Sequence, residues 1–370
     1  MNLESMKKLM SYIDDPETKE TINRIENNLE KIDRIKDRRE NPEEEKIRSK
    51  NILASLDESM KERVKEASRG VALVLTGGGA KASFQVGAWK AISDKKLLES
   101  VPGLTEGDNP RMGKITAIAG TSAGALNAAV FVGGNAALAE KLWSGVDEKK
   151  LVGENGFFGI SSGNDRYLES LIRGSGVIPG IHRDGTLTIA TAFDTDTGYP
   201  KDFVLNGMSE NEKVRALLAS SAYPIALKEQ RIKGVTYIDG GVPVFGSNMP
   251  VAPLYYLGFR RFIVIHCQSR KEGRDYADLN IFSAKLKQEQ YFGGAAFVHL
   301  YSRRDLGGIL DGTINFKHDV IMRNIYLGYM DMLAIRKDLD ALGSLPDSLE
   351  EVHLVDGESY GSYQKLLENL

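Results

Sequence analysis

Hydrophobic and polar residues follow two different patterns along the chain, and the change comes near residue 70. Up to residue 69 the chain is dense in charged residues, contains no glycine, and places single apolar residues three or four positions apart. The clearest series is Ile22, Ile25, Leu29, Ile32 and Ile35. Such spacing is typical of amphipathic helices, and Pro16 and Pro42 are expected near helix boundaries. Residues 1–69 are therefore predicted to form a charged helical segment.

Two kinds of role fit this helical segment. It can pack on the domain that follows or form a homodimer contact, or it can act as a regulatory or membrane-surface element. Its charges are mixed in sign, and a mixed helix face is usually a solvated one. The packing or dimer role is therefore favoured.

From residue 70 onward, short uninterrupted apolar runs alternate with segments of helical pattern. The runs predicted as buried strands are 71–75, 114–119, 186–192 and 261–265, and helices are predicted around 88–92 and 212–221. Beyond residue 271 the chain is predicted to be mostly helical, with one late strand at 351–355. Alternating strands and helices indicate an α/β domain with a mostly parallel central sheet that helices cover on both faces.

The composition excludes some classes of protein. With 42% hydrophobic residues among 370, the chain can bury a substantial core. Lys and Arg number 48 and Asp and Glu 51, for a net charge of −3, which argues against a nucleic-acid partner. The single cysteine, Cys267, excludes an intrachain disulfide, and its apolar neighbours predict a small core residue.

One window has the length of a membrane span. Residues 115–139 contain no charge over 25 positions, which is long enough to cross a bilayer. Glycines interrupt this window twice, however, so a strand, a tight turn and a helix of small residues are the better prediction. The N-terminal residues contain no apolar run of signal-peptide length. The protein is therefore expected to be soluble and cytoplasmic, with peripheral membrane contact left open.

The first candidate for chemistry is Ser122 in Gly120-Thr121-Ser122-Ala123-Gly124. Glycines on both sides of a serine let a strand turn sharply into a helix and present the hydroxyl in the open. The helix that follows brings partial positive charge to the same place. Since an apolar run precedes the motif and an Ala-rich helix pattern follows it, Ser122 is a candidate nucleophile.

A glycine loop lies upstream, in Gly77-Gly78-Gly79-Ala80-Lys81. Consecutive glycines can direct several backbone amides at one point, which suits a developing oxyanion. A dinucleotide fingerprint would need a glycine where Ala82 stands, and a phosphate loop would need Gly-Lys-Ser/Thr. A plain packing turn is the remaining alternative.

A catalytic serine also needs a base, and two candidates are compatible with the sequence. Asp239 ends a short apolar run and is followed by Gly240 and Gly241, although an Asp-Gly turn alone has the same appearance. The order Ser122, Asp239, His266 also satisfies the α/β-hydrolase triad. None of the five histidines has a flanking signature, and no pair has metal-ligand spacing.

Together these motifs resemble the patatin-like phospholipases. The similarity rests on the loop at 77–81, the pentapeptide at 120–124 and the triplet at 239–241, in that order, and on the wording at 219–224 and 248–254. It covers roughly residues 70–335 and looks like the bacterial branch of the family. Small departures occur at Ala82, where the family often has glycine, and at Gly241, where it often has alanine.

The resemblance implies a three-layer α/β/α sandwich and a lipid acyl hydrolase. It implies a dyad in which Ser122 is the nucleophile and Asp239 the base, with no cofactor and no metal. The amides of Gly77, Gly78 and Gly79 would form the oxyanion hole. The supporting residues would be Ala80, Lys81, Gly120, Gly124, Gly240 and Gly241.

Three regions follow from this interpretation: the helical segment 1–69, a catalytic domain 70–340, and an extension 341–370 that packs on it. The implied partner is a phospholipid or lysophospholipid, with transient membrane contact. Phe157 and Phe158 in a glycine-flanked loop are candidates for that contact, although adjacent phenylalanines more often fill a core. Two alternatives remain: a Ser-Asp-His esterase, and a lipid-binding relative without catalysis.

Overall fold

The computed structural model describes residues 50–93 except Ser55, then 115–152, 162–182, 185–223, 226–241, 248–269 and 294–335, with 338–339, 342 and 353–354. The amphipathic series at 22–35, the loop with Phe157 and Phe158, and nearly all of the extension 341–370 lie outside the described residues.

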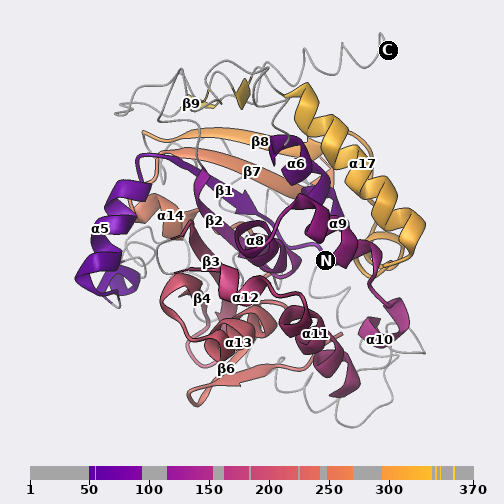
Figure 1. Ribbon diagram of the computed structural model, residues 1–370, viewed down its shortest axis with the longest axis horizontal. Coiled ribbons are helices and arrows are strands. Elements are labelled where there is room, and N and C mark those ends of the chain that lie inside the picture. The colour runs from indigo at the N-terminus through magenta and orange to yellow at the C-terminus, as the bar shows by residue number, and fades with distance from the viewer. Residues whose placement is uncertain are drawn as a thin grey trace.

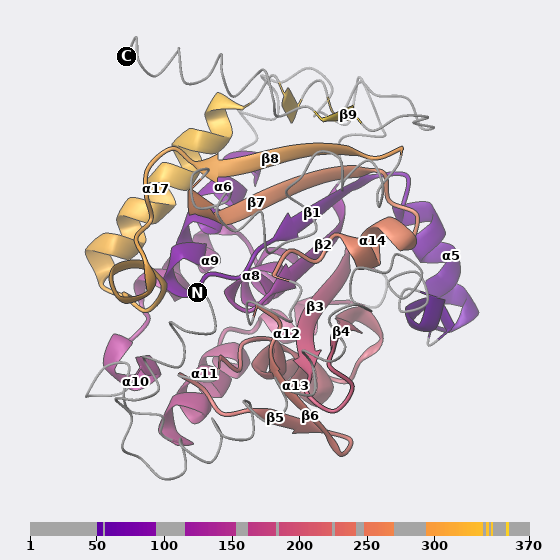
Figure 2. The same ribbon diagram turned by 180° about the vertical axis from the view of Figure 1, so that it is seen from behind.

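The described strands form one mostly parallel sheet (Figures 1 and 2), in the order β5-β6-β3-β2-β1-β7-β8-β9, with β4 paired to β3. Pairing is parallel from β3 through β2, β1, β7 and β8 to β9, and antiparallel among β3, β4, β5 and β6. The strands are β1 Val71–Leu75, β2 Ile115–Thr121, β3 Leu187–Asp194, β4 Tyr199–Val204, β5 Gln230–Ile232, β6 Val235–Asp239, β7 Arg261–Ser269, β8 Ala296–Ser302 and β9 His353–Leu354.

Helices cover both faces of this sheet. One apolar cluster joins α6, α8, α9 and α17 to β1, β7 and β8, and a second joins α5 and α14 to the opposite face. A third cluster packs α11, α12 and α13 against α8 and β3. The helices are α5 Glu58–Ala67, α6 Ser83–Ser93, α8 Ala123–Gly133, α9 Ala136–Ser144, α10 Glu148–Val152, α11 Ser162–Gly174, α12 Val177–Gly180, α13 Glu210–Ser220, α14 Ala252–Tyr256 and α17 His318–Ala334. The predicted three-layer α/β/α architecture is confirmed.

The central strands are hydrophobic throughout because both of their faces are covered. Every residue of β1 and of β3 is buried, as expected for parallel strands between two helical layers. The apolar runs at 71–75, 114–119, 186–192 and 261–265 each correspond to a strand, with ends displaced by a few residues. Cys267 lies inside β7 and is fully buried, as predicted.

The prediction for the region after residue 271, mostly helical with one late strand, missed β8. This segment pairs with β7 in parallel, whereas α17 and β9 in the same region agree with the prediction. The sequence of β8, Ala-Phe-Val-His-Leu-Tyr-Ser, contains a polar His299 that interrupts the apolar run, yet the strand is buried almost throughout. The antiparallel additions β4, β5 and β6 were also missing from the sequence-based outline.

The described part of the N-terminal segment packs on the domain. Met60 and Val64 of α5 and the preceding Ile52 join the apolar cluster on the α14 side of the sheet, and Asp57 caps α5 by accepting from the Met60 amide at 3.0 Å. Among the helices of the described residues, none is both long and apolar enough to cross a bilayer.

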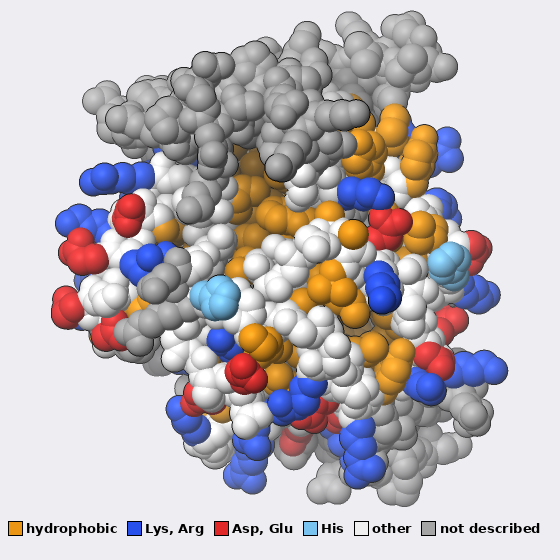
Figure 3. All heavy atoms as spheres, viewed as in Figure 1, with side chains coloured by type: hydrophobic (Ala, Val, Ile, Leu, Met, Phe, Trp, Pro, Cys, Tyr) orange, Lys and Arg blue, Asp and Glu red, His pale blue; other side chains and the backbone are white. Residues whose placement is uncertain are grey.

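The charge pattern on the surface is mixed. On the face shown in Figure 3, Lys and Arg side chains alternate with Asp and Glu around the edge, while hydrophobic side chains gather nearer the middle. The described residues of this face therefore carry no continuous basic stripe of the kind that nucleic acids require.

Candidate active site

The register of the sheet brings Ser122 and Asp239 together from distant parts of the chain. β2 and β6 pair with the same edge of β3, because β4 occupies the other edge. The last residue of β2, Thr121, is opposite Thr191, and the last residue of β6, Asp239, is opposite Ala192. Since one strand is parallel and the other antiparallel to β3, their carboxyl ends meet head to head. Ser122 follows Thr121 directly, so the two candidate groups become neighbours.

Ser122 sits on a sharp turn between β2 and α8. Its backbone angles are φ 57° and ψ −129°, a strained conformation that a residue with a side chain rarely adopts. The flanking glycines make the turn possible, because a Cβ on Gly120 would lie 2.2 Å from the Gly124 carbonyl oxygen and one on Gly124 2.4 Å from the Leu75 oxygen. This is the geometry of a serine presented at a strand-to-helix elbow.

Ser220, at the end of α13, holds this turn in place. Its hydroxyl accepts a hydrogen bond from the Ser122 amide at 2.9 Å and donates to the Thr191 carbonyl at 2.6 Å. Ser220 is fully buried. Ser220 belongs to the segment 219–224 that supported the resemblance, but the sequence pattern did not predict its hydrogen bond with Ser122.

Replacing Ser220 by alanine is expected to lower kcat about tenfold with little change in KM, because the Ser122 backbone loses the partner that orients it. The buried amide left without an acceptor should also lower the free energy of unfolding by about 1–3 kcal/mol. Steady-state kinetics and thermal unfolding measure both effects. Thr188→Val removes another buried hydroxyl of β3, which donates to the Thr186 carbonyl and lies outside the lining of the reaction cavity, and it should leave kcat unchanged. Equal losses of kcat in the two variants would contradict the positioning role.

The glycine loop after β1 is anchored by Asn248. The Gly77 amide donates to Asn248 Oδ1 at 3.0 Å and to its backbone carbonyl at 3.3 Å, so this amide is engaged within the protein. No hydrogen bond among the described residues occupies the amides of Gly78 and Gly79. A Cβ on Gly78 would lie 2.3 Å from Cys267 Cβ, and one on Gly79, at φ +56°, 2.1 Å from the Thr313 carbonyl oxygen. Only glycine fits at both positions.

Asp239 is almost completely enclosed, with 2% of its surface exposed. Its Oδ1 accepts from the Gly241 amide at 2.7 Å, and its Oδ2 is buried without a hydrogen-bond partner among the described residues. Burial raises the pKa of this carboxyl to about 7, although the nearby Ser122 hydroxyl and the Gly241 amide both act to lower it. Gly240 is required beside it, because a Cβ there would lie 2.4 Å from the Thr191 carbonyl oxygen.

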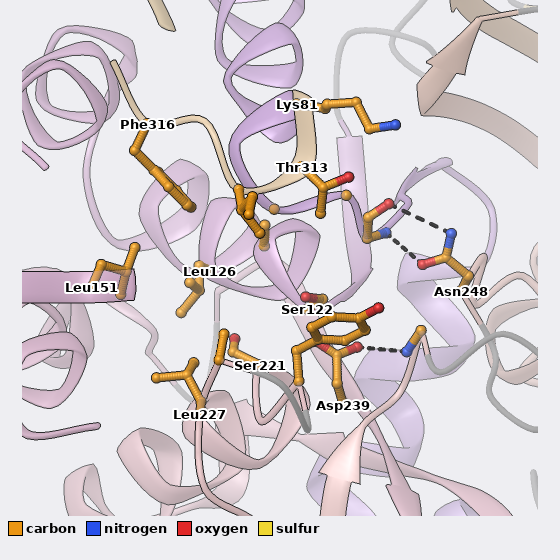
Figure 4. Close-up of a pocket in the computed structure, with 18 of the residues that line it drawn as sticks. Lys81, Ser122, Leu126, Leu151, Ser221, Leu227, Asp239, Asn248, Thr313 and Phe316 are labelled. Carbon is orange, nitrogen blue, oxygen red and sulfur yellow. Dashed lines mark hydrogen bonds between the residues drawn. The ribbon is translucent and has the colours of Figure 1, made fainter. Parts of the chain in front are cut away.

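These groups open into one cavity of about 280 Å³, which we call the reaction cavity. Figure 4 shows its two sides: Ser122, Asp239 and Asn248 lie at one end, and Leu126, Leu151, Leu227 and Phe316 lie at the other. A cavity with a small polar group set at one end and an apolar lining at the other suits an amphipathic ligand.

The remaining predicted residues of the glycine loop are buried beside the reaction cavity. Ala80 is fully buried, and Lys81 has 6% of its surface exposed. The Lys81 ammonium donates to the Gly307 carbonyl at 3.0 Å and lies near Cys267, whose thiol pKa is raised to about 12, chiefly by burial. The thiol is therefore neutral, and Cys267 is no candidate nucleophile.

The structure does not bring His266 to this site. His266 belongs to β7, is absent from the lining of the reaction cavity, and its Nε2 lies 3.0 Å from His299 Nδ1. Its ring stacks on Tyr301 at 3.8 Å between centroids. Burial and the neighbouring His299 hold its pKa well below the usual range. His182 and His318 are exposed, so no histidine of the described residues contacts Ser122 or Asp239.

Comparison with known proteins assigns the part of the chain that builds this site. VipD from Legionella pneumophila matches by structure at 12% identity over 81% of this chain and 75% of that chain, with a TM-score of 0.40. No curated protein matches. The family model "Patatin-like phospholipase" matches residues 73–255, which contain the glycine loop, the serine turn and Asp239. Residues 73–255 therefore belong to the patatin-like phospholipase family.

Proposed function

We propose that this protein hydrolyses the acyl esters of phospholipids or lysophospholipids with Ser122 as nucleophile and Asp239 as its base. The observation that carries the proposal is the meeting of β2 and β6 on one edge of β3, which sets the Ser122 hydroxyl beside the buried Asp239 carboxylate. Among the described residues, no other side chain or amide occupies Oδ2 of this carboxylate. A buried acceptor without a donor is costly and calls for a functional explanation. Accepting the Ser122 proton is a role that this carboxylate can perform.

The first step transfers the acyl group to the protein. Asp239 takes the Ser122 proton while Oγ bonds to the ester carbonyl carbon, and the carbonyl electron pair moves onto oxygen. Collapse of this tetrahedral oxyanion breaks the bond to the alcohol, which receives the proton from Asp239. The product is an ester of Ser122 and a free lysolipid or glycerophospho-alcohol.

The oxyanion needs hydrogen-bond donors that are not already engaged within the protein. The Gly77 amide already bonds Asn248, so we assign the oxyanion hole to the amides of Gly78 and Gly79, with Gly77 and Asn248 supporting their position. Removing one such donor typically lowers the rate by about 10²–10³.

The second step releases the fatty acid. Water gives a proton to Asp239 as its oxygen attacks the acyl carbon, and collapse returns that proton to Ser122. A carboxyl with a pKa near 7 is a better base toward hydroxyl groups than an exposed aspartate, whose pKa is about 3.9. Burial thus supplies the basicity that a histidine provides in a triad.

The experiment that tests this function is a fatty-acid release assay on phospholipid, lysophospholipid and neutral glyceride vesicles or micelles. We expect release from at least one phosphate-bearing class, with glycerides the poorer substrates. The absence of ester hydrolysis in every class, by folded protein, would leave a lipid-binding role instead and overturn the proposal.

The pH dependence of activity should follow Asp239. The carboxyl must be ionised to accept the serine proton, so kcat/KM for an uncharged ester is expected to rise with pH, reach half its plateau near the pKa of about 7, and level off above it. Initial rates between pH 5 and pH 9 measure this profile. A rate that falls across this range, or that is flat down to pH 5, would contradict the assigned base.

A further inference from the structure

A second, smaller cavity lies beside the reaction cavity. It measures about 100 Å³, and we call it the side cavity. Five residues line both cavities: Leu126, Trp143, Leu151, Leu168 and Phe316. Because the same side chains form a wall of each, the side cavity adjoins the apolar end of the reaction cavity, on the side away from Lys81 and Asn248 (Figure 4).

The lining of the side cavity selects an apolar occupant. Ala129, Val130, Val146 and Leu171 are typical of it. Its polar residues are already satisfied: Ser175 donates to the Ile172 carbonyl at 2.6 Å, and the Asn127 amide group is also fully used. A cavity without free polar partners does not hold ordered water well and takes apolar guests.

Trp143 stands between the two cavities in a fixed orientation. Its indole N–H donates to Asn127 Oδ1 at 2.7 Å, and its ring stacks on Phe316 at 6.3 Å and 9°. Asn127 in turn donates to Gln85 Oε1 at 2.9 Å, and Gln85 donates at 2.7 Å to the Thr76 carbonyl, just before the glycine loop. A buried chain of hydrogen bonds therefore sets the apolar wall relative to the loop that receives the ester.

We propose that the side cavity binds the methyl end of a long fatty acyl chain whose ester carbonyl lies at Ser122. This inference rests on the function proposed above and adds the substrate's chain length to it. The carbonyl must face Ser122 at the polar end, so the acyl chain runs past Leu126 toward Trp143 and Phe316. A short chain ends within the reaction cavity, whereas a long chain gains burial only by continuing into the side cavity.

Filling the side cavity tests this directly. Ala129→Leu adds bulk from α8, and Val146→Phe adds it from the opposite segment after α9; neither residue lines the reaction cavity. Each variant should lower kcat/KM for palmitoyl and oleoyl esters about tenfold or more and change it less than twofold for butanoyl esters of the same alcohol. Ala137→Leu places the same side chain at an exposed position of the neighbouring helix α9 and should change neither value.

The outcomes separate this inference from the function on which it rests. Undiminished hydrolysis of long-chain esters by both filled variants would overturn the side-cavity assignment while leaving the hydrolase intact. A loss confined to diacyl lipids, with long-chain monoacyl esters unaffected, would also overturn it, since the cavity would then hold a second chain. If wild-type protein hydrolyses neither long nor short esters, the proposed function itself fails. Because Ala129 is 1% exposed, the half-buried Val146 keeps the test valid if Ala129→Leu does not fold.

Discussion

Replacing Ser122 by alanine is expected to lower kcat for lipid ester hydrolysis by at least about 10⁴-fold, to the level that binding and oxyanion contacts alone sustain. The hydroxyl is the atom that bonds to the acyl carbon, and no neighbouring group can take its place in the same geometry. Fatty-acid release per folded protein measures the loss. Substrate affinity should persist, because the apolar lining and the glycine loop are untouched.

The matched control is Ser221→Ala. Ser221 also lines the reaction cavity, and its hydroxyl is buried without a partner among the described residues, so it is the rival serine. It does not sit on the strained turn after β2, which presents Ser122. We expect Ser221→Ala to retain activity within about threefold of wild type. The reverse ranking of the two variants would assign the nucleophile to Ser221.

Replacing Asp239 by asparagine should lower kcat by about 10³-fold or more, since an amide cannot accept the serine proton. The shape of the side chain is kept, and its remaining oxygen can still accept from the Gly241 amide. The loss should therefore appear in turnover, with folding preserved. Activity of Asp239→Asn near the wild-type level would make Asp239 a structural turn residue.

The same substitution should stabilise the protein at alkaline pH. Burial raises the pKa of Asp239 from its ordinary value of 3.8 to about 7 in the folded state, so the folded protein holds the proton more tightly than the unfolded chain. Its contribution to stability is complete below pH 4 and is lost as pH rises through 7. The free energy of unfolding of Asp239→Asn, measured by thermal unfolding, should therefore be higher than that of the wild type at pH 8, by an amount on the order of a few kcal/mol. This difference should vanish near pH 4.

His266→Ala separates the dyad from the triad. His266 is paired with His299 and stacked on Tyr301, away from the reaction cavity, so its removal should weaken packing but leave kcat per folded molecule nearly unchanged. Near-complete loss of turnover in folded His266→Ala would favour the triad.

Short sequence motifs predicted those parts of the candidate site whose geometry depends on a few consecutive residues. Gly120 and Gly124 are needed because backbone atoms occupy the space that a side chain would fill at each position. The five consecutive residues 120–124 are enough to reveal this requirement. The glycine loop has the same character. Asp239 was found because two glycines follow it, although its position beside Ser122 depends on strand register, which no local motif encodes.

Other parts depend on contacts between distant residues, and sequence patterns alone do not reveal them. Ser220 bonds Ser122 across 98 positions and Asn248 bonds Gly77 across 171. The side cavity is likewise a property of how α8, α9 and α11 pack. β8 was missed because His299 breaks its apolar run. This histidine is buried beside His266, its partner on β7, and that contact is again a tertiary one.

The most direct measurement for the central claim is the site of covalent labelling by a long-chain alkyl fluorophosphonate, which reacts with an activated serine and leaves a tetrahedral phosphonyl ester on its oxygen. Intact mass followed by peptide mapping identifies the residue. We expect a single adduct on Ser122, none on the Ser122→Ala variant, and much slower labelling of Asp239→Asn. An adduct on Ser221, or labelling that does not depend on Asp239, would contradict it.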